Sequence, residues 1–264
     1  MLNRIRRFLQ SGTSSLPVMD SVSAYALWAS DYPAEAHNAL MQVEERAMLA
    51  MLPDVTGLDV LDLACGTGRY GQFARAAGAQ SVIGLDNSAA MLHQGKLDRV
   101  ALATMNAIPL SANSMDVILC GMAIGHLPDI SAPIAEISRI LKPGGICLLS
   151  DFHPFQAFAG AQRSFHIDGQ SFAVEHYPHT YSIYHQAMQQ YHLSISQIDE
   201  VMIPGHIMTL PSFPLTPNKK IDRKALPEPT VQQPVGRAEP IQSDGIEGQI
   251  ATIWARILGV GDIR

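Results

Sequence analysis

The sequence is poor in charged residues and has no excess of positive ones. Only 16% of its 264 residues are charged, and 18 Lys and Arg stand against 24 Asp and Glu, a net charge of −6. Binding to a nucleic-acid backbone needs a positive surface, so this balance argues against nucleic acid as a partner. The hydrophobic content of 47% argues equally against disorder of the whole chain.

Cysteines are scarce as well. Cys65, Cys120 and Cys147 form no C-x-x-C pair, which argues against a disulfide framework and a cysteine metal site. The histidines give no H-x-x-x-H pair, so we expect no metal. No apolar run reaches the roughly 18 residues of a membrane span, and the basic first twelve residues lack the apolar core of a signal peptide. We therefore expect a reduced, cytoplasmic protein without a membrane partner.

What the chain does have is a regular alternation of strand-like and helix-like segments. The expected strands are 58–64, 81–86, 100–104, 115–120 and 145–151, and the expected helices are 38–53, 68–77, 88–96 and 131–141. Short apolar strands alternating with helices predict an α/β fold with a doubly wound, mostly parallel sheet. Further on, 171–177 and 193–203 could be strands, and 179–192 a helix.

The strongest motif follows the first of these strands. Gly66-x-Gly68-x-x-Gly71 makes a strand-to-helix turn where the backbone can approach a ligand closely. Read literally, it fits a dinucleotide fingerprint, with Asp86 as the ribose acceptor. Asp62, at the end of the preceding strand, would repel a pyrophosphate but would pair with the α-amino group of an adenosyl amino-acid ligand. An aspartate that only caps the turn or lies in solvent is the alternative interpretation.

At these positions the sequence resembles the class I S-adenosylmethionine-dependent methyltransferases, particularly those of ubiquinone and menaquinone biosynthesis (methyltransferase type 11). The matching stretches are VLDLACGTGRYG (60–71), VIGLDNSAAML (82–92), IPLSANSMDVILCGMAIGHLPD (108–129) and ISRILKPGGICLLSDFHP (137–154). The resemblance covers about 22–203, after an N-terminal segment 1–21. It implies a Rossmann-like sheet of seven strands, S-adenosyl-L-methionine as cofactor and S-adenosyl-L-homocysteine as product.

The resemblance also implies a set of cofactor-binding residues. Asp62, Gly66 and Gly68 would lie around the methionine part, Asp86 at the ribose and Asn87 beside the adenine, with Tyr32 (and Tyr25) in an N-terminal lid. The full expected set is Tyr32, Asp62, Ala64, Gly66, Gly68, Asp86, Asn87, Thr104, Met105 and Gly121. Thr104-Met105 stands where the family often has Asp-Ala, so the adenine contacts depart from the family pattern.

Candidates for the chemistry follow the fourth and fifth expected strands, where such sheets form clefts. His126 comes after the fourth strand, and Asp151 and His153 after the fifth. An imidazole titrates near neutrality and could remove a proton from the methyl acceptor, with Asp151 orienting the substrate or a histidine. Packing or capping roles are the alternatives.

From residue 204 the composition changes to proline-rich and polar, which predicts a domain boundary. LTPNKKIDRKAL (215–226) resembles the closing motif of adenylation domains of non-ribosomal peptide synthetases, and Lys220 matches the lysine that contacts the acyl-adenylate. IEGQIATIWARILGV (246–260) resembles the first helix of a carrier domain. We expect an adenylation-domain remnant at 204–229, a linker at 230–245 and a carrier-domain fragment at 246–264.

Together these features predict an S-adenosylmethionine-dependent methyltransferase of secondary metabolism, associated with a non-ribosomal peptide synthetase. Its substrate would be a small molecule or a carrier-bound peptide intermediate, and synthetase modules its partners. Two alternatives stay open: a non-catalytic interaction module or synthetase remnant, and an NAD(P)-dependent oxidoreductase.

Overall fold

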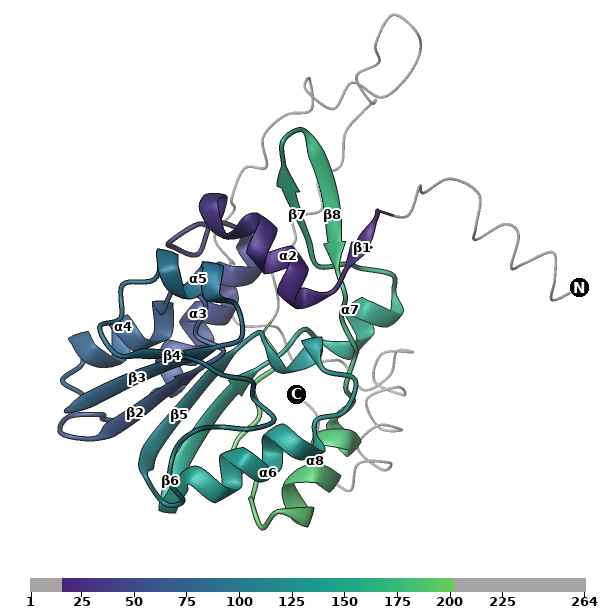
Figure 1. Ribbon diagram of the computed structural model, residues 1–264. Coiled ribbons are helices and arrows are strands. Elements are labelled where there is room, and N and C mark those ends of the chain that lie inside the picture. The colour runs from purple at the N-terminus through teal and green to yellow at the C-terminus, as the bar shows by residue number, and fades with distance from the viewer. Residues whose placement is uncertain (1–15, 202–264) are drawn as a thin grey trace, which may run out of the picture. The chain divides into compact units, whose positions relative to one another are not determined.

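A computed structural model describes residues 16–201 of the chain (Figure 1). Contacts within the chain divide it into Met1–Ile203 and Pro204–Arg264, and only the first part contains described residues. The predictions for 204–229, 230–245 and 246–264 therefore lie outside the described residues. Within 16–201, no helix is both long enough and apolar enough to cross a membrane.

The central element is a parallel five-stranded sheet with strand order β4-β3-β2-β5-β6. Its strands are β2 (Asp59–Leu63), β3 (Ser81–Asp86), β4 (Val100–Leu102), β5 (Met115–Gly121) and β6 (Leu141–Ser150). The chain runs outward from β2 to β4 and then returns to the other side of β2, so the strand order reverses between β2 and β5. This is the doubly wound, Rossmann-like arrangement predicted from the sequence, and the reversal marks where such sheets bind ligands.

Both faces of this sheet are covered by helices. Leu61, Ile118 and Cys120 face one apolar cluster, which contains Ile134 and Ile137 of α6 (Ser131–Ile140). The alternate positions Val60, Val117 and Leu119 face the second cluster, with residues of α3 (Ala39–Met51) and α4 (Arg69–Ala76). Successive side chains of a strand point to opposite faces, so strands buried on both sides read as the continuous apolar runs seen in the sequence.

The remaining helices are short, and a side chain caps the start of some of them. α5 (Ala89–Gln94) begins after Ser88, whose hydroxyl accepts a hydrogen bond from the Met91 amide as expected. Ser131 was expected to cap α6, but its side chain does not cap the helix. Instead, the Asp129 carboxylate accepts a hydrogen bond from the Ser131 amide. The others are α2 (Ser21–Trp28), η1 (Ala29–Asp31), η2 (Ile124–His126), α7 (Pro154–Phe158) and α8 (Tyr181–Gln190).

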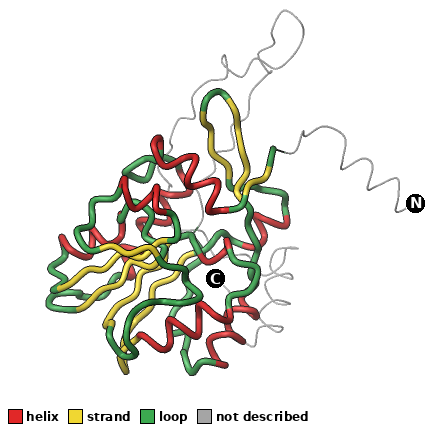
Figure 2. Tube along the Cα trace, in the orientation of Figure 1, coloured by secondary structure: helices red, strands yellow, loops and turns green. Residues whose placement is uncertain are grey.

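The chain after β6 differs from the sequence expectation. The strand expected at 171–177 exists as β8 (Gln170–Val174), but it pairs with β7 (Ser164–Ile167) and β1 (Val18–Met19) in a separate three-stranded sheet. Figure 2 shows this hairpin standing apart from the large sheet. The strand expected at 193–203 is wrong for its described part, since residues 193–201 form no strand. In residues 16–201 the large sheet thus has five strands, whereas seven were expected.

A turn signal in the sequence explains the unexpected hairpin. Asp168 and Gly169 both have positive φ, at 48° and 76°, and they join Ile167 and Gln170, which pair directly. Asp-Gly in a two-residue loop is a strong hairpin signal. The hairpin buries Phe165, Ile167 and Val174 against Ala24 of α2, which fixes α2 beside it (Figure 1).

Candidate cofactor and active site

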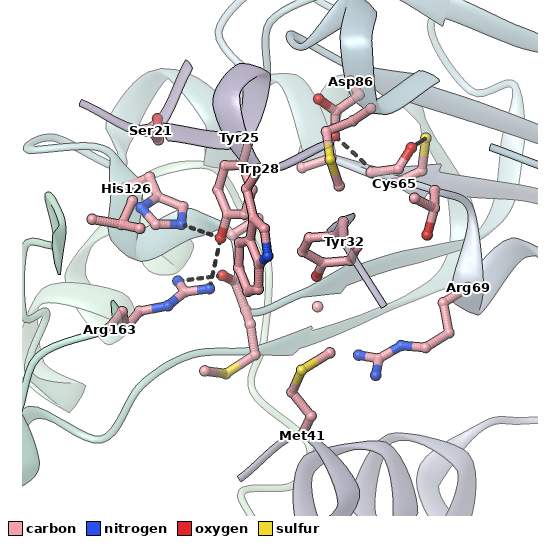
Figure 3. A pocket seen from close by; sticks show the side chains of 18 of the residues that line it. Ser21, Tyr25, Trp28, Tyr32, Met41, Cys65, Arg69, Asp86, His126 and Arg163 are labelled. Atoms are coloured by element: carbon pink, nitrogen blue, oxygen red, sulfur yellow. Dashed lines mark hydrogen bonds between the residues drawn. The ribbon is translucent and has the colours of Figure 1, made fainter. Parts of the chain in front are cut away.

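A cavity of about 500 Å³ lies where the strand order reverses. The ends of β2 and β3, the loop after β5, helix α2 and the residues before β7 all contribute to its wall. Figure 3 shows side chains from these elements converging on it. Carboxyl ends of neighbouring parallel strands meet at one edge of the sheet, so residues distant in sequence come together here.

The glycine-rich turn forms one end of the cavity through Ala64, Gly66 and Thr67. Gly66 and Gly68 have φ of 55° and 83°, which glycine adopts without steric cost. Gly68 does not line the cavity; a Cβ there would lie 2.6 Å from Cγ of Leu97. Gly68 is therefore needed for the turn and for close packing. Ala64 adopts the same left-handed conformation at φ 55° with a side chain.

Asp62, at the end of β2, lines the cavity and is 1% exposed. Its Oδ2 accepts a hydrogen bond of 2.7 Å from the Gly71 amide in the first turn of α4. Gly68 precedes this helix and has no side chain that could cap it, so Asp62 supplies the cap from the neighbouring strand. Burial raises the pKa of Asp62 to about 7, and a cationic group in the cavity would favour its charged form.

Asp86, at the end of β3, holds the turn from the other side. Its Oδ2 accepts the Gly66 amide at 2.7 Å and its Oδ1 accepts the Ser88 amide at 2.8 Å. Burial raises the pKa of this carboxyl above its usual range. Each carboxylate oxygen has two acceptor positions, so both can still accept hydrogen bonds from a ligand.

Only some of the residues expected beside the adenine lie in the cavity wall. Asn87 and Met105 line the cavity together with Ala103, but Thr104 does not. Thr104 instead forms an isolated antiparallel bridge with Ala107, which turns the chain at this point.

Gly121, at the end of β5, lines the cavity, and a larger residue has no room at this position. A Cβ on Gly121 would lie 2.3 Å from Cε2 of the Tyr70 ring. Behind it the buried Glu44 carboxylate accepts the Tyr70 hydroxyl at 2.5 Å and the Ser150 hydroxyl at 2.6 Å. This network fixes the floor of the cavity.

Arg69 was not singled out from the sequence, although it follows the glycine turn directly. It lines the cavity, and its Nη2 forms an ion pair of 3.3 Å with Glu44. Its buried Nη1 lies 3.4 Å from an oxygen of Glu45 but has no hydrogen-bond partner in residues 16–201. A buried guanidinium with an unused N–H fits a ligand carboxylate, and Asp62 in the same cavity fits an ammonium. These residues suit the amino-acid part of an adenosyl ligand.

Aromatic side chains of α2 and the following loop form another wall. Trp28 stacks near Tyr25 with ring centroids 6.2 Å apart and meets Tyr32 edge-on at 4.8 Å. Burial raises the pKa of Tyr32 to about 12, so its hydroxyl stays protonated. Tyr32 was expected here from the sequence; Trp28 was not, although it lies between the two tyrosines in the chain.

Of the three catalytic candidates, only His126 lines the cavity. Its Nδ1 lies 2.8 Å from the Glu175 carbonyl oxygen, which can only accept, so Nδ1 carries the proton and Nε2 accepts from the Tyr25 hydroxyl at 3.2 Å. Burial, followed by the charge of Arg163, lowers the pKa of His126 to about 3. The imidazole is therefore neutral near pH 7.

Asp151 and His153 lie outside the cavity wall. Asp151 accepts the Tyr184 hydroxyl at 2.6 Å and lies 3.3 Å from Nε2 of His176, in a buried cluster behind His126. Burial alone would raise the pKa of Asp151, but the hydrogen bonds of His176, Tyr184 and the Phe152 amide hold it below its usual range. His153 caps α7 by accepting the Phe155 amide at 3.2 Å.

Within the described part of the chain, no group of three or more His, Cys, Asp or Glu side chains is placed to hold a metal ion.

Comparison with known proteins agrees with this geometry. Residues 61–149 match the family model described as a methyltransferase domain. A structure of an S-adenosylmethionine-dependent methyltransferase from Mesorhizobium loti superposes with a TM-score of 0.54 at 22% identity, covering 63% of this chain and 88% of that one. A methyltransferase bound to the Haloferax volcanii Trm112 activator also gives 0.54, at 20% identity, over 71% and 84%.

This is the fold of the S-adenosylmethionine-dependent methyltransferases. The cofactor of the methyltransferase domain is S-adenosylmethionine, as the sequence predicts, and not the dinucleotide that the glycine motif also allowed. Fold class and cofactor are thus confirmed.

Curated relatives of the methyltransferase domain differ in their substrates. A malonyl-[acyl-carrier protein] O-methyltransferase of Pectobacterium atrosepticum is 28% identical over 175 residues, 65% of this chain and 68% of that protein. A demethylmenaquinone methyltransferase of Lactococcus lactis is 32% identical over 143 residues, 48% of this chain and 56% of that protein. Against most such relatives, the chain spans about half of their length. Tyrocidine synthase 3 of Brevibacillus parabrevis is 44% identical over 73 residues, 27% of this chain and 1% of that protein.

Proposed function

We propose that this chain transfers the methyl group of S-adenosylmethionine to a small-molecule or carrier-bound peptide intermediate of secondary metabolism, in association with a non-ribosomal peptide synthetase. The observation that carries the proposal is that one cavity has two chemically different ends. The glycine turn with Asp62 and Asp86 forms one end, and Tyr25, His126 and Arg163 form the other. A cofactor and an acceptor can thus share one cavity.

We assign the first end to the cofactor. Asp86 would accept the ribose hydroxyls, with Asn87 and Met105 beside the adenine. Asp62 would pair with the α-ammonium group and Arg69 with the carboxylate. The assignment is supported by the burial of both aspartates and by the unused Nη1 of Arg69. Charge-assisted hydrogen bonds in a site shielded from water are stronger than exposed ones.

The bound cofactor supplies a methyl group already activated by a sulfonium centre. The work left to the chain is to exclude water and to align the acceptor. Trp28 and Tyr32 would cover the cavity, and Gly121 leaves room for the Tyr70 ring in its wall. We place His126 next to the acceptor because its ring lines the cavity. For Asp151 and His153 we propose no contact with the acceptor.

The proposal of a carrier-bound acceptor and a synthetase partner is supported by the similarity to relatives. Several relatives are named for a substrate attached to an acyl-carrier protein, and a short similarity links the chain to tyrocidine synthase 3. The resemblance of 204–229 to an adenylation domain and of 246–264 to a carrier domain points in the same direction.

The decisive test is calorimetric titration of the full chain with S-adenosylhomocysteine, with NAD as control. We expect micromolar binding of the first and none of the second. Transfer of labelled methyl groups would then be compared between aminoacyl groups on a peptide-synthetase carrier and the same groups as free thioesters. Absence of binding by either nucleotide would instead support a non-catalytic module or a synthetase remnant. Binding of NAD alone would contradict the cofactor assignment.

A further inference from the structure

Arg163 is a cation in the cavity wall, and no carboxylate of residues 16–201 forms an ion pair with it. Its Nη1 donates to the Met122 carbonyl oxygen at 2.6 Å and its Nη2 to the Tyr25 hydroxyl at 3.1 Å. Among the ion pairs of residues 16–201, none involves Arg163. A guanidinium has five N–H donors, so three remain for a ligand. In Figure 3 its planar group points toward Tyr25 and Trp28.

Met122, whose carbonyl oxygen accepts a hydrogen bond from Arg163, has an unusual backbone conformation. Met122 has a positive φ of 54°, which is strained for a residue with a side chain. Its amide donates to both the carbonyl and the hydroxyl oxygen of Ser150, at 3.0 and 2.9 Å. Its carbonyl oxygen accepts the hydrogen bond of Arg163. The strained residue thus anchors the guanidinium at the cavity wall.

The groups next to Arg163 cannot take up a proton near neutral pH. Tyr25 of α2 already accepts from Arg163 and donates to His126. His126 has a pKa of about 3, too low for efficient proton transfer at pH 7. Behind it, after β6 and β8, Asp151 and His176 are paired with each other.

The carboxylates of the cavity cannot serve as the base either. In the described residues, Asp62 and Asp86 are the carboxylates that line the cavity, and both lie at the glycine turn, the end that we assign to the cofactor. The acceptor end thus offers a cation with free N–H groups, but no base. Such an end suits an acceptor that is already an anion.

We propose that the acceptor binds through a carboxylate held by the free N–H groups of Arg163, and that a carboxylate oxygen takes the methyl group to give a methyl ester. This inference rests on the proposed function and deepens it. One O–C bond forms while the S–C bond breaks, and the electron pair of that bond goes to sulfur. The negative charge of the carboxylate and the positive charge of the sulfonium disappear together. No proton is released, so no general base is needed.

Binding tests the carboxylate site without relying on turnover. With the full chain saturated by S-adenosylhomocysteine, calorimetry would compare phenylacetate, 4-phenylbutyrate and octanoate with the alcohols and amines of the same skeletons. We expect at least one carboxylate to bind at least tenfold more tightly than its alcohol or amine. Arg163→Gln should weaken that binding about ten- to hundredfold, since hydrogen bonds to charged groups contribute that much. Arg163→Lys should restore part of it.

The controls separate loss of the site from loss of the fold. Arg75→Gln removes an exposed arginine of α4 that does not line the cavity, and it should bind the carboxylate as the unchanged protein does. The Arg163 variants should keep their affinity for S-adenosylhomocysteine. Equal affinity for the three kinds of probe, or carboxylate binding unchanged by Arg163→Gln, would overturn the inference.

The product gives a second readout. A methyl ester releases labelled methanol in alkali, whereas methyl groups on nitrogen, carbon or an ether oxygen stay bound. At saturating cofactor, the rate should also be flat between about pH 6 and 8, because a carboxylate of ordinary pKa is ionised throughout. If S-adenosylhomocysteine binds but the methylated product is stable in alkali, the inference is overturned and the proposed function is not. Failure of S-adenosylhomocysteine to bind would overturn the proposed function and the inference with it.

Discussion

The carboxylate of Asp62 caps helix α4 from the neighbouring strand, since its Oδ2 lies 2.7 Å from the amide nitrogen of Gly71. A capping aspartate and a ligand-binding aspartate were alternatives in the sequence. In the structure one side chain can do both, because it is buried between the helix start and the cavity. The cap and the ligand site are therefore coupled through its charge.

That coupling predicts an unusual dependence of stability on pH. The pKa of Asp62 is about 7 in the folded protein and 3.8 in the unfolded chain. Between these two pH values the folded protein therefore binds more protons than the unfolded chain. The ligand-free protein should lose stability through this group as the pH rises from about 4 to 7. Asp62→Asn removes the titration and should flatten the urea-unfolding profile over that range. An identical slope in the variant would contradict the assignment.

Asp86 should be needed for cofactor binding beyond its role in the turn. Asp86→Asn keeps an acceptor for one of the two amides but loses the charge that favours hydrogen bonds from ribose hydroxyls. We expect affinity for S-adenosylhomocysteine to fall at least tenfold, about 1.4 kcal/mol, by calorimetry. The exposed Asp98 gives the matched control, Asp98→Asn, whose affinity should not change. Unchanged binding in Asp86→Asn would reject the ribose assignment.

Gly121→Ala should destabilise the fold by about 1–3 kcal/mol, the usual cost of overpacking. The new Cβ would lie 2.3 Å from the Tyr70 ring, which its hydroxyl holds against Glu44. A double-mutant cycle in chemical denaturation checks the cause: in a Tyr70→Ala background the penalty should largely disappear. An equal penalty in both backgrounds would place the strain elsewhere.

Ala64→Gly should stabilise the protein by about 0.5–1 kcal/mol. Ala64 has φ 55°, and the left-handed conformation costs a residue with a Cβ roughly 1–2 kcal/mol, more than the extra chain entropy of glycine. The same substitution at Ala74, a buried residue inside α4, should destabilise by about 1 kcal/mol or more. Thermal and urea unfolding of the pair would show opposite signs if the backbone conformation is the cause.

His126 should remain neutral over the whole physiological range. Its folded pKa of about 3 lies below the unfolded value of 6.5, so the unfolded chain binds the proton first and stability falls as the pH drops from about 6.5 to 3. Proton NMR should show no shift of the His126 ring signal between pH 5 and 8. His126→Gln should lessen the acid-induced loss of stability. A ring titrating near pH 6.5 would restore His126 as a candidate base.

Several features of the structure depend on contacts between distant segments, and the sequence predictions were incomplete or wrong at these points. The strand 171–177 was expected because its pattern is correct for a strand, but pattern alone does not say which sheet a strand joins. The Asp168-Gly169 turn pairs it with β7 before it can reach the large sheet. His153 and Asp151 follow β6 as expected, yet α7 and the His176 pair turn both side chains away from the cavity. Thr104 likewise does not line the cavity, because it forms a β-bridge with Ala107.

The sequence by itself determined the parallel α/β sheet, the glycine turn and the positions of Asp62 and Asp86. These features are local, since a strand, a turn and the first turn of a helix are read within about a dozen residues. Only the tertiary structure decided the acceptor end. Tyr25 meets His126 across 101 residues and Arg163 across 138, and the neutral state of His126 depends on burial by segments far along the chain. Burial and charge at a point in space depend on every element packed around it, and no local pattern records them.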